Sequence, residues 1–175
     1  MKLRIKNTSI TLQIIGWLQI IGGITGIVLM GYLMLNLGTI TGILLLLLLV
    51  GIFLYSFSIY TGKWLLVDND KKTGIILSII NQFVQVFQFC LFGFGFTYSS
   101  GVELVIGIQG FSLKFNAAII TSNFQMTIHS TNIGFLKINL MAVLILITLL
   151  SILKEFNNKK NDVSIDSNIV ELDEI

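Results

Sequence analysis

Residues 73–98 read TGIILSIINQFVQVFQFCLFGFGFTY. A membrane helix needs about 20 predominantly apolar residues, and this stretch is long and apolar enough to form one. It carries a polar stripe of five side chains at helical spacing: Ser78, Asn81, Gln82, Gln85 and Gln88. At about 3.6 residues per turn, these five fall within an arc of about 120°. Because a carboxamide is costly to bury without a partner, we expect the stripe to face other helices and to hydrogen-bond with them.

The composition indicates a membrane protein. Of 175 residues, 54% are hydrophobic and only 11% are charged, whereas a soluble domain carries about 25% charged residues. The mean hydropathy is +0.89. The single cysteine, Cys90, lies within an apolar run, so neither an intrachain disulfide nor a cysteine metal site is expected. A net charge of +2 is too small to indicate nucleic acid as a partner.

Four apolar runs are predicted to be transmembrane helices, at residues 10–37, 39–60, 73–96 and 133–153. Apolar and polar residues alternate in the segment between the last two, residues 97–132. Such alternation is typical of strands with one buried face. The predicted fold is an α-helical membrane protein, a four-helix bundle of four transmembrane helices. A small antiparallel β-meander lies between helices 3 and 4.

The positive charges predict the orientation of the chain in the membrane. Nine of the eleven Lys and Arg lie on the side of both predicted termini: Lys2, Arg4, Lys6, Lys63, Lys71, Lys72, Lys154, Lys159 and Lys160. Such residues favour the cytoplasmic side. We therefore expect the N-terminal segment 1–9, the loop 61–72 and the acidic tail 154–175 in the cytoplasm, and the meander outside. The expected location is a cell membrane, in particular a bacterial inner membrane, crossed by a multi-pass chain.

Small residues recur on one face of the first predicted helix. Gly16, Gly23 and Gly26 lie on this face together with Gln19. Small residues let a second helix come close, and we expect that helix to be the one at 73–96. Matching the two helices by depth predicts a hydrogen bond from Gln19 to Asn81 or Gln82. These glycines and the polar stripe are the predicted packing residues.

The chemistry that the sequence lacks is also informative. No Asp, Glu, Lys, Arg or His lies deep in any predicted helix, which argues against a pump or an ion-coupled transporter. His129 is the only histidine, and it offers with Glu103 too few ligands for a metal site. No catalytic grouping and no phosphate-binding loop is present. We therefore expect no catalytic, cofactor-binding or metal-binding residues, no cofactor and no enzymatic activity.

In composition and in its predicted number of helices, the chain resembles small four-pass bacterial membrane proteins of unassigned function. The resemblance is carried by the abundance of Ile, Asn, Lys and Phe and by no motif. It implies a multi-pass membrane fold and assigns no site residues.

The predicted function is that of a non-enzymatic integral membrane protein. It is expected to act as a subunit or accessory factor of a membrane complex, since so small a sheet needs cover to be stable. The contacts would be the outer meander and the polar stripe. The expected partners are the lipid bilayer and either another copy, giving an oligomer, or another membrane protein. The alternative is a homo-oligomeric channel or small-molecule pore lined by the amides of the stripe.

Overall fold

We describe the protein from a computed structural model, in which residues 7–36, 38, 41–67, 71–127 and 134–172 are described, with side chains to Asn158. His129 and the N-terminal Lys2, Arg4 and Lys6 lie outside the described residues, as does most of the acidic tail's side-chain structure.

Three helices in the described part of the chain are long and apolar enough to cross a membrane. They are α1 (Thr8–Asn36), α2 (Gly42–Leu66) and the first 19 residues of α4 (Leu140–Leu172). The continuous aliphatic sequence of each favours a helix, because in hydrocarbon the backbone must satisfy its own hydrogen bonds. The Thr41 hydroxyl caps α2 by accepting from the Leu44 amide at 3.3 Å. These helices place the protein among membrane-associated proteins.

The prediction of four transmembrane helices is wrong at the third helix. This helix, α3, covers only Lys71–Val86, 16 residues, and so rises about 24 Å, less than the hydrocarbon core of about 30 Å. At Phe87 the chain passes directly into a strand, β1 (Phe87–Leu91). The sequence explains the change, because apolar residues alternate with Gln and Cys from Phe87 to Leu91 and with Gly from Phe92 to Phe96, a period of two rather than 3.6 in each segment.

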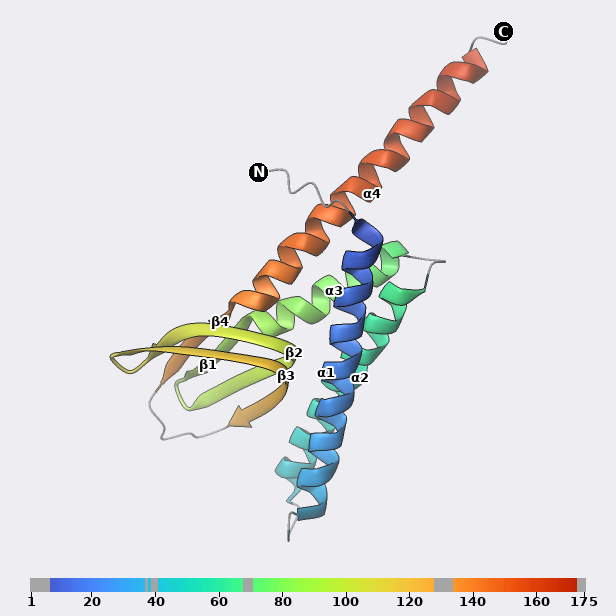
Figure 1. Ribbon diagram of the computed structural model, residues 1–175. Helices are drawn as coiled ribbons and strands as arrows, with labels where there is room; N and C mark the ends of the chain where they lie inside the picture. Colours follow the sequence, from blue (N-terminus) through green and yellow to red (C-terminus); the bar gives the residue numbers. More distant parts are fainter. Residues whose placement is uncertain (1–6, 37, 39–40, 68–70, 128–133, 173–175) are drawn as a thin grey trace.

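The prediction of a small meander within residues 97–132 is also wrong, because the sheet begins at Phe87, ends at Asn139 and has four strands in an order that is not that of a meander. After β1 come β2 (Phe94–Gln109), β3 (Ser112–Thr127) and β4 (Phe135–Asn139), antiparallel in the order β1-β4-β2-β3. β1 also pairs with the start of β2, so that β1, β2 and β4 close a small ring of pairings. Figure 1 shows this curled sheet beside the helices.

A bulge bends the long β2–β3 hairpin. The register between the two strands shifts at Gly101 and Val102, and Ile120 is the extra residue on β3. Gly101 has a φ of 104° and Ile120 a φ of 56°. Positive φ suits glycine but is a true outlier for a β-branched residue, as occurs where a bulge forces it. The bulge allows one half of β2 to pair with β1 and the other half with β4.

Alternation gives the sheet a polar inner face and an apolar outer face, the reverse of a sheet folded around an oily core. Part of the outer face packs on α1 and α2, where Tyr98 joins a core cluster with Met30, Leu48 and Tyr55. The rest, which we call the uncovered apolar face, comprises Ile108, Leu113, Phe115, Ile119, Leu136 and Ile138, all exposed. The sheet thus exposes to its surroundings the side chains that a soluble protein would bury.

Asn139 joins the sheet to the last helix. Its Oδ1 accepts from the amides of Met141 (3.1 Å) and Ala142 (3.3 Å), which caps α4. The same oxygen accepts from the Leu104 amide in β2 at 3.3 Å. The start of α4 is therefore fixed to the sheet, and α4 runs from there toward the end of the molecule at which α1 begins (Figure 1).

Candidate functional site

A buried polar network joins the helices to the sheet, and Gln19 on α1 lies at its centre. Its Oε1 accepts from the hydroxyls of Thr61 on α2 (2.7 Å) and Ser78 on α3 (3.2 Å). The sequence predicted Asn81 or Gln82 as its partner. The structure gives Gln19 a different residue of the polar stripe, one turn earlier on α3. α1 is therefore linked by hydrogen bonds to both α2 and α3.

From Gln19 the network continues through Ser58 into β2. The Ser58 hydroxyl donates to the backbone oxygen of Gln19 (3.1 Å) and lies 3.1 Å from the Ser100 hydroxyl. Asn81 Nδ2 donates to Ser58 Oγ at 3.2 Å. Gln85 Oε1 accepts from the Ser100 amide at 2.9 Å. Amides of the polar stripe thus bind a hydroxyl group of α2 and a backbone amide of the sheet, both of which are buried.

All five residues of the polar stripe are buried within a single chain, with exposed fractions between 0% and 3%. Four lie on α3 and Gln88 lies on β1. The predicted packing glycines contact α2 rather than α3. A Cβ at Gly16 would be 3.0 Å from the Gly62 oxygen, and one at Gly23 would be 2.7 Å from the Tyr55 oxygen. At Gly26 a Cβ would overlap the Tyr55 ring.

Sequence reasoning missed the contact that fixes the depth of the sheet. A Cβ at Gly22, the midpoint of α1, would overlap the backbone of Ser100 and Gly101, so helix and bulge touch backbone to backbone. Next to this contact the Ser122 hydroxyl donates to the Gly22 oxygen at 2.7 Å and lies 2.6 Å from the Thr25 hydroxyl. The sheet is therefore attached at the middle of α1.

A second contact fixes the same depth on α2. The Tyr98 hydroxyl donates to the backbone oxygen of Leu54, the midpoint of α2, at 2.9 Å. Tyr98 is fully buried, so this bond gives its hydroxyl a partner where water does not reach. Both candidate spans thus meet the sheet halfway along their length.

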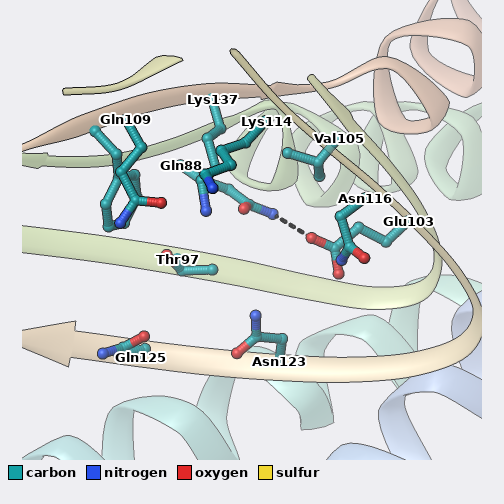
Figure 2. Close-up of a pocket in the computed structure, with 11 residues that line it drawn as sticks. Gln88, Thr97, Glu103, Val105, Gln109, Lys114, Asn116, Asn123, Gln125 and Lys137 are labelled. Atoms are coloured by element: carbon teal, nitrogen blue, oxygen red, sulfur yellow. Dashed lines mark hydrogen bonds between the residues drawn. The ribbon is translucent and has the colours of Figure 1, made fainter. Parts of the chain in front are cut away.

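The inner face of the sheet surrounds an open cavity of about 530 Å³, a size typical of small-molecule sites. Polar side chains from all four strands line it, among them Gln88, Thr97, Glu103, Gln109, Asn116 and Gln125 (Figure 2). This cavity is the candidate functional site.

Glu103 is a buried acid in this cavity, with only 4% of its surface exposed. Its Oε1 accepts from Gln88 Nε2 at 3.0 Å, and its Oε2 accepts from the Ser99 hydroxyl at 3.0 Å. Figure 2 shows the Gln88 bond. Both donors are neutral. An ionised carboxylate has about four acceptor positions, so these bonds leave room for a further donor.

Two lysines lie on the same inner face, on either side of Gly107. In the register of the sheet, Lys114 on β3 and Lys137 on β4 are both opposite Gly107 on β2. A Cβ at Gly107 would be 2.5 Å from Lys137 Cγ, so the missing side chain makes room for the lysine stem. Lys137 Nζ lies 4.5 Å from the centre of the Phe135 ring. The pair provides two positive charges at the cavity wall.

The sequence itself marks this site by the rarity of charged residues around it. Between residues 73 and 153 the only Asp, Glu, Lys or Arg are Glu103, Lys114 and Lys137, and all three line the one cavity. Among the described residues, no three His, Cys, Asp or Glu side chains come together as metal ligands do. The arrangement is suited to binding by charge and hydrogen bonding.

No family model matches the chain, and comparison with curated proteins and with solved structures gives no significant match.

Proposed function

We propose that the protein is a non-enzymatic integral membrane protein that acts as a subunit of a membrane complex, and that this complex contains a second copy joined along β3. The observation that carries the proposal is the free edge of β3 beside the uncovered apolar face. Among the strands that the structure describes, β3 is at the end of the strand order and pairs with β2 alone. Leu113, Phe115 and Ile119 on it are 72%, 66% and 80% exposed.

The depth of the sheet makes a free edge costly. The sheet meets α1 and α2 at their midpoints, Gly22 and Leu54. If these helices cross a bilayer, the sheet lies at least partly at the level of the hydrocarbon. Water is scarce there, and each unsatisfied N–H or C=O costs several kcal/mol, so open sheet edges are not left facing lipid. A paired edge removes this cost, while the apolar outer face is suited to the lipid bilayer.

A second β3 is a matching partner for this edge. From Ser112 to Ala117 apolar and polar side chains alternate, so antiparallel pairing of two copies continues both faces, apolar outside and polar inside. A two-fold axis makes the contact self-complementary, as in most homodimers. The alternative, a pore lined by the amides of the polar stripe, gains no support, because Asn81, Gln85 and Gln88 bind other groups of the same chain.

The test is a disulfide scan along β3. In a Cys90→Ser background, single cysteines replace Leu113, Phe115, Ala117 and Ile119, which share the outer face. The protein is oxidised in native membranes and the cross-linked dimer is quantified. Two β3 strands around a two-fold axis bring only the residues nearest the axis within disulfide distance. We therefore expect one maximum of dimer yield that falls away on both sides.

The matched control is Leu144→Cys on the exposed side of α4, 56% exposed, which should form little dimer. The mass of the intact complex in mild detergent provides an independent measurement, with two copies expected. Equal cross-linking at all four β3 positions and at residue 144, together with a monomeric mass, would disprove the proposed assembly.

A further inference from the structure

The geometry points to a binding site for a small zwitterionic ligand in the cavity of the sheet, with a phosphate at Lys114 and Lys137 and an ammonium at Glu103. This inference does not depend on the proposed assembly. Figure 2 shows the two lysines toward one part of the cavity and Glu103 toward another.

The first argument is the distribution of charge. Three charged residues occur between residues 73 and 153, and all three are on the inner face. The outer face of the same strands is apolar, as the exposed Leu113, Phe115 and Leu136 indicate. Charged groups are expensive near hydrocarbon and mark functional positions there. Their concentration in one cavity indicates a site for a charged ligand.

The second argument is that the opposite charges are kept apart. Glu103 is buried, and the partners described for it are the neutral Gln88 and Ser99. The lysines lie opposite Gly107, four residues further along β2, which is about 13 Å along an extended strand. The long lysine side chains shorten this separation. A buried acid favours a cationic partner, and the lysine pair favours an anion, so one ligand with both charges satisfies both ends.

The third argument concerns the kind of anion. Two lysines supply two positive charges against the single negative charge of Glu103. An alkyl phosphate carries about −1.5 to −2 charges near pH 7 and three acceptor oxygens, and lysine is a common phosphate ligand. An aminoalkyl phosphate is therefore complementary to the cavity, with its phosphate opposite the two lysines and its ammonium opposite Glu103. A free aminoalkyl phosphate has this full charge. The headgroup of an aminophospholipid presents the same ammonium beside a phosphodiester, which carries one negative charge.

The test compares three probes on the full chain, purified in a neutral detergent at low salt. They are phosphoethanolamine, which has both charges, and its two parts, ethanolamine and methyl phosphate. Calorimetric titration gives the affinities. We expect phosphoethanolamine to bind at least about tenfold more tightly than either part, which corresponds to one favourable charged contact.

The variants assign each end of the ligand. Glu103→Gln should weaken phosphoethanolamine about tenfold or more while leaving methyl phosphate unchanged or tighter, because only the ammonium loses its partner. Lys137→Met and Lys114→Met should weaken both phosphates. The control Lys154→Met removes an equal charge from α4, outside the cavity, and should change neither affinity. Lys114 is exposed, so Lys114→Met is expected to fold. It therefore still tests the phosphate end of the site if Glu103→Gln does not fold.

The source of the ligand is found with the protein in phosphatidylcholine nanodiscs with or without phosphatidylethanolamine. A lower apparent affinity for phosphoethanolamine in the nanodiscs that contain phosphatidylethanolamine supports the headgroup as the ligand, because the lipid then competes for the cavity. An unchanged affinity supports the soluble compound. The inference is overturned if phosphoethanolamine binds no better than its parts. It is also overturned if Glu103→Gln weakens methyl phosphate equally, or if Lys154→Met has the effect of the cavity variants.

Discussion

At Gly22 the backbone of α1 touches the backbone of β2 at the bulge, and the hydroxyl of Ser122 bonds to the Gly22 oxygen. Glycine is required here by space rather than by conformation, since any side chain would have to occupy the position of the Gly101 backbone. Neither backbone can move without breaking the helix or the sheet. A single hydrogen atom in place of a side chain therefore determines where the sheet is attached.

We predict that Gly22→Val destabilises the protein by about 1–3 kcal/mol or more, as expected for inserting methyl groups into a packed contact. The measurement is thermal unfolding in detergent, followed by circular dichroism. Gly31→Val is the matched control, because a Cβ at Gly31 has no other atom within 4 Å. Equal unfolding temperatures for the two variants would contradict the backbone contact at Gly22.

Among the elements, the three long helices and the presence of strands between residues 97 and 132 were predictable, whereas β1 and β4 were not, because both lie in segments predicted to be helical. The long aliphatic runs of α1, α2 and α4 have no competing structure in hydrocarbon. At Gln88, however, both periods fit the sequence: the residue continues the helical polar stripe and also begins the alternation of β1. A helix was predicted through Gln88 because the four preceding residues of the polar stripe have helical spacing. A five-residue strand following a helix without a loop gives no turn signal at its start.

The candidate site was predictable in part. The three isolated charged residues could have been singled out by their rarity in an apolar segment. Their assembly could not, because it depends on the register of three strands. The bulge at Gly101 shifts that register by one residue, and a shift of one residue moves a side chain to the other face. Lys114 and Lys137 meet across Gly107 only in the observed pairing.

We predict that the pairing of β1 with β4 can be trapped as an intramolecular disulfide. Phe135 is the register partner of the native Cys90, and paired side chains on one face lie about 5 Å apart. Phe135→Cys should therefore form a disulfide with Cys90 on oxidation, detected by mass spectrometry with and without reductant. Leu136→Cys, on the opposite face, should not. A third helix continuing to residue 96 would predict no bond in either variant.

At the scale of the whole molecule, the chain can be divided into two parts that meet through buried polar contacts and through two apolar clusters. The α1–α2 hairpin is one part, and α3, the sheet and α4 form the other. Their interface combines the Gln19 bond to Ser78, the Tyr98 bond to Leu54 and the contact of Gly22 with the bulge. Interhelical hydrogen bonds in membranes contribute on the order of 0.6 kcal/mol each, so the interface depends on their number and on close packing.

We predict that the two parts associate when they are made as separate chains, residues 1–67 and 71–175. A tag on the first should co-purify the second from detergent-solubilised membranes. Gly22→Val in the first chain should reduce recovery of the second, and Gly31→Val should leave it unchanged. If the two unaltered pieces are both present in the membrane but do not co-purify, the contacts described between them are not sufficient for association and the prediction is wrong.

The ring formed by β1, β2 and β4 also imposes an order on the folding of the newly made chain. β1 and β2 are joined by a short turn and can pair as soon as both have left the ribosome. β4 pairs with both of them but is made only after the entire β2–β3 hairpin. Because Asn139 ends β4 and caps α4, closure of the ring is coupled to the start of the last helix. A chain that stops before Phe135 lacks β4 and therefore leaves the polar cavity without its fourth wall.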